Sequence, residues 1–226
     1  MTLPSDSGTT AANAAGKHQG EPLQVPPRSK ITGVVLAGGL GRRMGGKDKG
    51  LLEINGRPLI THIIDILRPQ VGSVLINANR NLDSYRGFGL PVVQDMVGEF
   101  CGPLAGMASA LQASDTPYLL TVPCDSPLLP VDLCTRLYRA LTSANAEISA
   151  AHDGSRMQPM FALLRREVLQ DLLVYLKHGG RKTDTWYTEH RFILVDFSDR
   201  TEAFLNINTP AEWHTLKERM KSGETG

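Results

Sequence analysis

The sequence predicts an α/β fold: a Rossmann-like, doubly wound and mostly parallel sheet with helices on both faces. Three observations lead to this prediction. Short apolar runs alternate with segments of helical spacing, as in parallel sheets with crossover helices. The first run, ITGVVLA at residues 31–37, has the apolar content of a strand buried on both faces. Polar residues suited to chemistry follow directly after such runs, where open α/β sheets bind their ligands.

The expected strands and helices follow one another in regular alternation. A short extended piece at residues 49–56 ends in a turn at Asn55-Gly56, a pair that is typical of turns. The expected strands are at residues 31–37, 73–79, 91–95, 117–125, 146–153, 160–166 and 191–197. The expected helices are at residues 57–69, 102–114, 130–144, 167–179 and 208–221.

The first and last of these helices carry local start and stop signals. In the first, apolar residues recur at helical spacing, Pro58 suits a first helical turn and Pro69 ends the segment. In the last, Thr209 is the expected N-cap, Pro210 the first helical residue and Glu212 the capping-box acid.

Composition predicts one folded domain behind a disordered tail. Residues 1–29 are rich in Ser, Thr, Gly, Pro and Ala and contain no apolar segment of the kind found in signal peptides. Such a composition buries too little apolar surface to offset the entropy lost on ordering. We expect residues 30–222 to form a single α/β domain.

Charge and cysteine content argue against several classes of function. The chain has 24 Lys and Arg against 23 Asp and Glu, so its net charge of +1 gives no basis for binding nucleic acid or an acidic membrane. No apolar run in the sequence approaches the roughly 18 residues of a membrane span. The three cysteines form no CxxC pair, which argues against a zinc site and favours a reduced, cytoplasmic setting.

A glycine-rich loop, LAGGLGRRMGGKDKG at residues 36–50, follows the first expected strand. It does not match the dinucleotide fingerprint, because Met44 stands where the third glycine belongs. It matches the P-loop only as far as Lys47, because Asp48 replaces the hydroxyl that binds magnesium. Its glycines and basic residues still suit an anion, since exposed backbone N–H groups form concave anion sites.

The blocks of this sequence resemble the molybdenum cofactor guanylyltransferases, of the MobA type within the nucleotidyltransferases. The resemblance begins with LAGGLGRRMGGKDKGLLEINGRPL and continues, in order, through INANR, GPLAG, VPCDSP and LNINTPAE. It covers residues 31–217 and leaves out the tail. It implies a Rossmann-like nucleotidyltransferase domain, with a nucleotide-binding N-terminal half and a molybdopterin-binding C-terminal half. The implied reaction transfers GMP from GTP to the terminal phosphate of Mo-molybdopterin, with magnesium, and releases pyrophosphate.

The resemblance also implies roles for residues of the N-terminal half. Asn77 and Asp95 would hold the guanosine, and the sequence leaves open which of them pairs with the base. The backbone of the loop would meet the GTP at four consecutive residues, Leu36, Ala37, Gly38 and Gly39. Two cations would neutralise phosphate charge during transfer, Lys49 as the main one and Arg43 as a second.

Asp125 of the PCD block would ligate magnesium and also contact the GTP. A hard cation takes oxygen ligands, and magnesium commonly keeps one or two carboxylates together with substrate phosphates. Its neighbour Cys124 is expected to be a packed residue rather than a nucleophile, and Asp48 receives no assigned role beyond orienting Lys49 or a nearby arginine.

In the C-terminal half, the resemblance implies that Asn206, Asn208 and Arg181 contact molybdopterin, with Lys182 as a further candidate. The two asparagines are two residues apart and would point to one face of an extended segment. The implied partners are GTP, Mo-molybdopterin and, transiently, cofactor insertion proteins or target apoenzymes.

Three other functions stay open at this point. The nearest alternative is a cytidylyltransferase for the same pterin, but Gly38-Gly39 and Cys124 are typical of the guanosine enzymes. A nucleotidyltransferase acting on sugar or polyol phosphates shares the loop but fits the later blocks less well. A non-catalytic molybdopterin carrier would not need Lys49 and Asp125.

Overall fold

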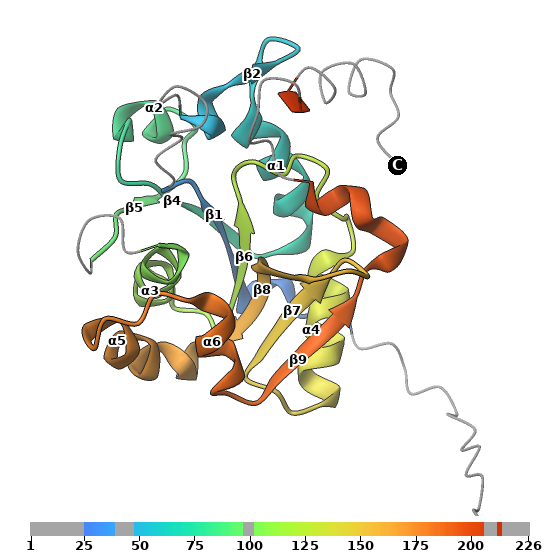
Figure 1. Ribbon diagram of the computed structural model, residues 1–226. Helices are drawn as coiled ribbons and strands as arrows, with labels where there is room; N and C mark the ends of the chain where they lie inside the picture. Colours follow the sequence, from blue (N-terminus) through green and yellow to red (C-terminus); the bar gives the residue numbers. More distant parts are fainter. Residues whose placement is uncertain (1–24, 39–47, 97–101, 206–211, 214–226) are drawn as a thin grey trace, which may run out of the picture.

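The computed structural model describes residues 25–38, 48–96, 102–205 and 212–213, and Figure 1 shows a central sheet with helices packed against it. The sheet has seven strands in the order β5-β4-β1-β6-β8-β7-β9. The strands are β1 Ile31–Leu36, β4 Ser73–Asn77, β5 Val92–Val93, β6 Tyr118–Pro123, β7 Ile148–His152, β8 Met157–Arg165 and β9 Phe192–Asp196. The helices are α1 Leu59–Leu67, α2 Leu82–Arg86, α3 Pro103–Ala113, α4 Leu133–Ser143, α5 Leu169–Lys177 and α6 Thr183–Thr188.

The direction of the strands confirms the predicted mostly parallel sheet. β1 pairs in parallel with β4 on one side and with β6 on the other, and β4 pairs in parallel with β5. β8 runs antiparallel to both of its neighbours, β6 and β7, whereas β9 is parallel to β7. Because the strand order reverses beside β1, the point between β1 and β6 is the topological switch where such sheets bind ligands.

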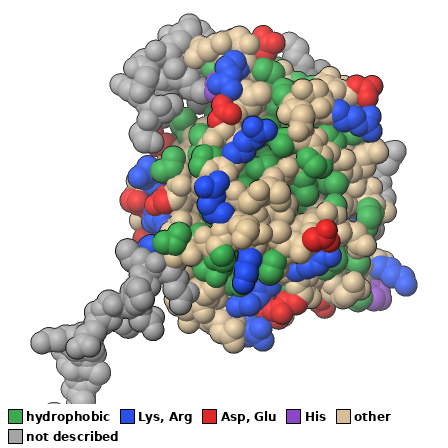
Figure 2. Space-filling model, turned by 180° about the vertical axis from the view of Figure 1, so that it is seen from behind, with side chains coloured by type: hydrophobic (Ala, Val, Ile, Leu, Met, Phe, Trp, Pro, Cys, Tyr) green, Lys and Arg blue, Asp and Glu red, His purple; other side chains and the backbone are tan. Residues whose placement is uncertain are grey.

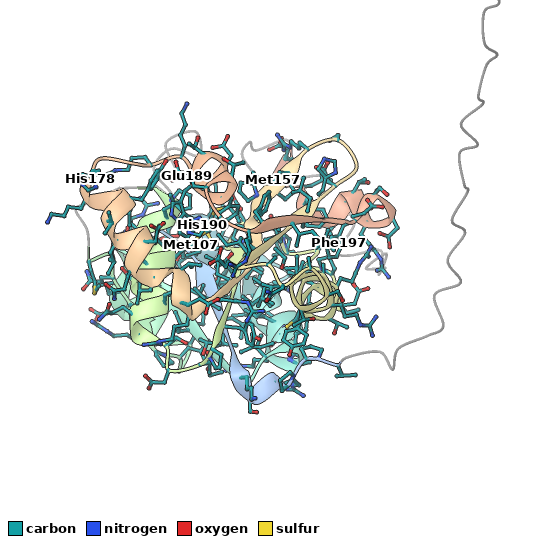
Figure 3. All side chains as sticks on the ribbon, turned by 90° about the horizontal axis from the view of Figure 1, so that it is seen from below. Met107, Met157, His178, Glu189, His190 and Phe197 are labelled. Atoms are coloured by element: carbon teal, nitrogen blue, oxygen red, sulfur yellow. The ribbon has the colours of Figure 1, made fainter. Side chains whose placement is uncertain are left out.

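Two apolar cores cover the two faces of this sheet, as a doubly wound fold requires. One core joins β1 to α1 and α4 and includes Tyr85 and Phe197, while the other joins the sheet to α3, α5 and α6 and includes Met107. Seen from below, Met107 and His190 lie on one side of the molecule and Phe197 on the other (Figure 3). All six residues of β1 are buried, as its apolar run predicts.

The segment after the glycine loop differs from its prediction. Asn55 and Gly56, both with positive φ, form the predicted turn, but it joins two short strands, β2 Glu53–Ile54 and β3 Arg57–Pro58. Pro58 is extended, with φ −55° and ψ 140°, so it precedes α1 as its N-cap instead of occupying the first helical turn. A tight turn in the chain favours pairing of the two flanking residues on each side over extension of the helix.

Two short helices, α2 and α6, are absent from the sequence-based expectation. They have only five and six residues, which is too short for a helical period to be recognised. β8 begins at Met157, three residues before its predicted start at Met160, because its first residues pair with the end of β7 across a bulge. The other predicted strands and helices are confirmed to within a few residues at their ends.

Most of the expected C-terminal helix lies outside the described residues. Of that segment, Glu212 and Trp213 are described and are helical. Trp213 packs against Ile54 and Leu59, so the chain returns to the β2–β3 ribbon near its end. Within the described part of the chain, none of the helices has the length and apolar content that crossing a membrane would require.

On one face of the molecule, the described charged side chains are distributed without a dominant sign. On the face turned away from the view of Figure 1, lysines and arginines are scattered among acidic, neutral and hydrophobic side chains (Figure 2). On this face, the described side chains form no basic stripe of the kind that tracks a nucleic acid backbone, in agreement with the net charge of +1.

Candidate active site

The site forms where four parallel strands end at one edge of the sheet. β1, β4, β5 and β6 are adjacent and parallel, so the residues that follow them emerge side by side. We call this the nucleotide edge, and define it by the residues after these strands: 37–38, 78–80, 94–95 and 124–125. Its centre lies between β1 and β6, where the Cys124 N–H donates to the Leu36 carbonyl at 3.1 Å.

Lys49 and Asp125 form an ion pair at this edge. The Lys49 Nζ lies 2.9 Å from the Asp125 Oδ2, and the two side chains are only 18% and 15% exposed. Lys49 begins a single 3₁₀ turn, Lys49–Leu51, after the glycine loop, while Asp125 follows β6, so 76 positions separate them in the chain. A partly buried pair of this kind is weakly screened by solvent, and it holds both side chains at the edge of the sheet.

Cys124 lies beside this pair and is buried. Burial, together with the nearby Asp125 and Asp48 carboxylates, raises the pKa of the Cys124 thiol far above its usual range. The thiol therefore stays protonated near neutral pH, whereas nucleophilic cysteines need the thiolate. Cys124 packs the site, as expected from the sequence, and is not a nucleophile.

Asp95 is held by two asparagines of the INANR block. Asn77 donates from Nδ2 to the Asp95 Oδ1 at 2.9 Å and also to the Val93 carbonyl at 3.3 Å. Asn79 makes two bonds: its Nδ2 donates to the Asp95 Oδ2 at 2.8 Å, and its Oδ1 accepts from the Asp95 N–H at 2.9 Å. Both carboxylate oxygens are thus oriented by amide donors, and the carboxylate is fixed before any ligand arrives.

Two motif glycines allow this cluster to pack. A Cβ at Gly106, the last residue of GPLAG, would overlap the Oδ1 of Asn77, so α3 can approach β4 only with glycine at this position. A Cβ at Gly38 would lie 3.3 Å from the Nδ2 of Asn79. Asn77 is therefore enclosed, with 2% of its surface exposed, whereas Asp95 is only partly buried.

The backbone at the end of β1 is largely used by the sheet. Ala37 donates its N–H to the Asn77 carbonyl at 2.8 Å, and the Leu36 carbonyl accepts from Cys124. The Leu36 side chain packs in the core beside α3. Three of the residues expected to contact GTP through their backbone are described: Leu36, Ala37 and Gly38. Of these, Gly38 is the least buried.

A surface hollow of about 510 Å³ adjoins the nucleotide edge and is lined by residues 79–84 and Arg86. This volume is within the range of small-molecule sites. Two of its lining residues, Asn79 and Arg80, belong to the clusters that hold Asp95 and Asp48.

The residues present suit a divalent cation of the magnesium type. Within the described ranges, no group of three or more His, Cys, Asp or Glu side chains could hold a metal ion by itself. Magnesium does not need such a cage, because it commonly binds through one or two carboxylates together with waters and substrate phosphates. Asp125 offers one such carboxylate at the centre of the edge.

The C-terminal half presents a different kind of polar structure at the same edge. Asp153, in the turn between β7 and β8, accepts hydrogen bonds from the Ser155 hydroxyl, from the Ser155 and Arg156 N–H groups and from the Gln158 side chain. Partial burial acts to raise the pKa of Asp153, but these hydrogen bonds outweigh it and hold the pKa well below its usual range. This arrangement fixes a turn.

Arg181, the expected molybdopterin contact that the structure describes, caps a helix. Its Nη1 donates to the Leu176 carbonyl at 2.9 Å and to the Gly180 carbonyl at 2.6 Å, at the end of α5. The residue is exposed, and its backbone carbonyl lies near Gly102, where the GPLAG block begins. Four further expected site residues lie outside the described residues: Gly39, Arg43, Asn206 and Asn208.

Sequence reasoning missed four polar residues that the structure places in these clusters: Asn79, Arg80, Asn81 and Tyr85. Asn79 carried a signal, because it lies two positions after Asn77 at the end of a strand. Tyr85 carried none, because its hydroxyl contacts Asp48, 37 positions earlier in the chain, from a helix that the sequence did not predict.

Comparisons with known proteins show which family the chain belongs to. Residues 33–191 match the family model of the MobA-like NTP transferase domain. A molybdenum cofactor guanylyltransferase of Shewanella pealeana is 45% identical over 196 residues, covering 87% of this chain and 98% of the relative. One from Shewanella baltica is 49% identical over 188 residues, covering 83% and 96%.

A solved structure is similar in fold. The molybdopterin-guanine dinucleotide biosynthesis protein A of Archaeoglobus fulgidus superposes with a TM-score of 0.72 over 84% of this chain and 99% of that one. At 19% sequence identity, this likeness speaks for the fold alone.

Proposed function

The chain belongs to the MobA-like NTP transferase family, and on this premise we propose that it is a molybdenum cofactor guanylyltransferase. It transfers GMP from GTP to the terminal phosphate of Mo-molybdopterin, giving molybdopterin guanine dinucleotide and pyrophosphate. One observation supports this most directly: the Lys49–Asp125 pair at the switch point and Asp95 beside the end of β4 lie along one edge of the sheet, in a chain 45% identical to a guanylyltransferase over nearly its whole folded length.

We assign the recognition of guanine to Asp95. A guanine base presents two N–H donors side by side, and a carboxylate with two acceptor oxygens is their natural partner. Asn77 is enclosed and its amide already donates to Asp95, so it orients the carboxylate and does not itself meet the base. Asn79 supports Asp95 from the other side. In this assignment, Asp95 contacts the ligand, and the two asparagines position it.

Gly38 and Lys49 act on the ribose-phosphate part of the nucleotide. Gly38 is partly exposed at the nucleotide edge, and its lack of a side chain allows a ligand to approach the backbone closely. Lys49 carries a positive charge next to Asp125, at the position where the α-phosphate and the leaving pyrophosphate would lie. Its ammonium group neutralises the charge that accumulates on these oxygens during transfer.

The reaction needs little acid–base help from the protein. The terminal phosphate of molybdopterin is already an anion at neutral pH and attacks the α-phosphorus directly. The bond from the α-phosphorus to the bridging oxygen breaks, and pyrophosphate leaves with the electron pair. The main tasks of the chain are alignment and charge neutralisation, because two anions must approach each other.

Asp125 is the proposed ligand of a magnesium ion. A bound divalent cation supplies further neutralisation of the phosphate oxygens and helps to orient them. The contribution of this chain is to present the Asp125 carboxylate, partly buried and oriented by Lys49, at the centre of the edge. The remaining ligands would come from the substrate and from water.

The residues expected at the molybdopterin side remain proposals. Arg43, Asn206 and Asn208 retain the roles that the family resemblance implies, and Arg181 could reach a phosphate only if its guanidinium shared its hydrogen bonds with the end of α5. By the same resemblance, we propose a cytoplasmic enzyme that passes its product on through transient contacts with cofactor insertion proteins or target apoenzymes.

One assay tests the activity and its base specificity. The purified full chain is incubated with magnesium, molybdopterin carrying molybdate, and each nucleoside triphosphate in turn, and pyrophosphate release is measured. We expect release with GTP. Release with CTP but not GTP would overturn the assignment of guanine to Asp95. Tight binding of molybdopterin without turnover of any triphosphate would favour a carrier instead of an enzyme.

A further inference from the structure

A buried carboxylate stands immediately before Lys49. The Asp48 side chain is 5% exposed, and three side chains from another part of the chain surround it. The Tyr85 hydroxyl donates to its Oδ1 at 2.6 Å, and the Asn81 Nδ2 donates to its Oδ2 at 3.0 Å. The Arg80 Nε lies 3.6 Å from the same Oδ2 and balances the charge. Asp48 is thus tied to α2, through Tyr85, and to the residues just before α2, through Arg80 and Asn81.

The same tyrosine also contacts the residue after Lys49. A Cβ at Gly50 would lie 2.7 Å from the Tyr85 hydroxyl oxygen and 3.5 Å from the Cys124 Cβ. Gly50 therefore packs directly on Tyr85 and Cys124, in a space that no larger residue can enter without displacing them. The residues on both sides of Lys49, Asp48 and Gly50, therefore both contact the Tyr85 hydroxyl group.

This arrangement decides which carboxylate Lys49 meets. One carboxylate near Lys49 belongs to Asp48, its neighbour in the chain, and another belongs to Asp125 after β6. Asp48 already accepts from Tyr85 and Asn81, so its oxygens are satisfied and its charge is balanced by Arg80. An unsatisfied buried carboxylate would instead attract the nearest ammonium group strongly.

Tyr85 is suited to this task because it remains a donor. It is fully buried, and burial is the main reason that the pKa of its hydroxyl lies far above its usual range. Its ring belongs to the same apolar core as β1 and α1 and lies against Phe88, which fixes the position of the hydroxyl. The donor cannot ionise at physiological pH, and it cannot swing away from Asp48.

From these contacts we infer that Tyr85 is a positioning residue for guanylyl transfer: through Asp48 and Gly50, its hydroxyl directs Lys49 to Asp125. The inference rests on the proposed function in one respect, namely that Lys49 neutralises phosphate charge. It adds a residue that touches neither nucleotide nor pterin but determines where the positive charge lies.

Tyr85→Phe tests the inference, because it removes the hydroxyl and leaves the ring. We expect kcat for GMP transfer to fall about tenfold to a hundredfold, the size of effect that a misplacement of about 1 Å can have on an aligned reaction. The KM for GTP should change little, because Asp95 and its asparagines are untouched. The matched control is Tyr187→Phe, which removes another fully buried hydroxyl, one that donates to the Pro159 carbonyl at 2.8 Å. It should leave kcat unchanged.

A double-mutant cycle separates positioning from a loss of stability. In a Lys49→Gln background, Tyr85→Phe should have no further effect on kcat, because the group that it positions is already absent. If Tyr85→Phe lowers kcat by the same factor with and without Lys49, or if Tyr187→Phe lowers it equally, the positioning role is wrong.

A measurement that does not use activity tests the geometry by itself. At a limiting dose of acetic anhydride, acetylation of Lys49, read by mass spectrometry of peptides, should rise several-fold in Tyr85→Phe and not in Tyr187→Phe. Unchanged labelling would overturn the inference. The wild-type protein could lack GMP transfer while the Tyr85→Phe variant still showed increased labelling of Lys49. That pair of results would overturn the proposed function and support the positioning of Lys49 by Tyr85.

Discussion

The nucleotide edge and the β7–β8 turn lie at the same edge of one sheet, but they are held together differently. At the nucleotide edge, the polar contacts join distant parts of the chain: Lys49 with Asp125 across 76 positions, and Tyr85 with Asp48 across 37. In the β7–β8 turn, Asp153 bonds only to neighbours within five positions in the contacts that the structure describes. Arg181 likewise bonds within its own helix end.

The difference indicates which polar groups serve a ligand and which serve the fold. Contacts within a few residues fix the local backbone, and many proteins use them as turns and caps. Contacts between separate strand ends hold side chains in place that the local chain would leave free, and this preorganisation is what catalysis by alignment needs. Substitutions at the two places should therefore differ in what they affect: activity at the nucleotide edge, stability at the turn.

The largest effect is expected for Asp125→Ala, which tests the centre of the nucleotide edge. Loss of the carboxylate removes the proposed magnesium ligand and the partner of Lys49, so kcat/KM should fall about a thousandfold or more. The far-ultraviolet circular dichroism spectrum should stay unchanged, because the side chain lies at a strand end. As a control, Asp65→Ala breaks an exposed 2.7 Å ion pair between Asp65 of α1 and Arg57 of β3 and should retain activity. Activity retained by Asp125→Ala would remove the metal assignment.

Gly106→Ala is expected to have the next largest effect. The added methyl group would overlap the Asn77 Oδ1, which is enclosed and can move only by giving up its bond to Asp95. We expect the KM for GTP to rise about tenfold to a hundredfold and the free energy of unfolding to fall by about 1–3 kcal/mol, as in other overpacked cores. Steady-state kinetics and urea unfolding measure the two effects. Gln112→Ala, at an exposed position of the same helix, should change neither quantity.

Asn79→Ala should have a more moderate effect that is confined to nucleotide binding. It removes two hydrogen bonds that orient Asp95 but leaves the bond from Asn77. We expect the KM for GTP to rise about tenfold with kcat nearly unchanged, which is the pattern of a lost ground-state contact. A fall in kcat without a rise in KM would contradict the assignment of Asp95 to the base.

Asp153→Asn probes the β7–β8 turn and should leave the kinetics of GMP transfer unchanged. An amide cannot accept from all the groups that now donate to the carboxylate, so the free energy of unfolding at pH 7 should fall by about 1–2 kcal/mol. Because the pKa of Asp153 is lowered in the folded state, its contribution is complete above the unfolded value of about 3.9 and is lost as the pH falls further. The stability difference from wild type should therefore narrow in acid. If the difference in the free energy of unfolding between Asp153→Asn and wild type did not depend on pH, the charge of Asp153 would make no contribution to stability.

The sequence by itself determined the fold class, the positions of most strands and helices, and the grouping of Asn77, Asp95, Lys49 and Asp125 at one edge. Apolar periodicity depends on near neighbours, and the ends of parallel strands must meet at one edge, so these features can be inferred locally. The motif blocks then indicated the chemistry through the family resemblance that they carry, and three of them, the glycine loop, INANR and VPCDSP, lie at the ends of predicted strands.

Only the tertiary structure decided how these residues are held. The sequence did not indicate that Asp48 is enclosed by Tyr85, Asn81 and Arg80. It also did not indicate that Asn79 forms two hydrogen bonds with Asp95. It also left out α2, whose five residues carry Tyr85 and are too few to show a helical period. The physical reason is the same in each case. Which donor meets a buried carboxylate depends on the packing of segments far apart in the chain, and local propensity contains no information about that packing.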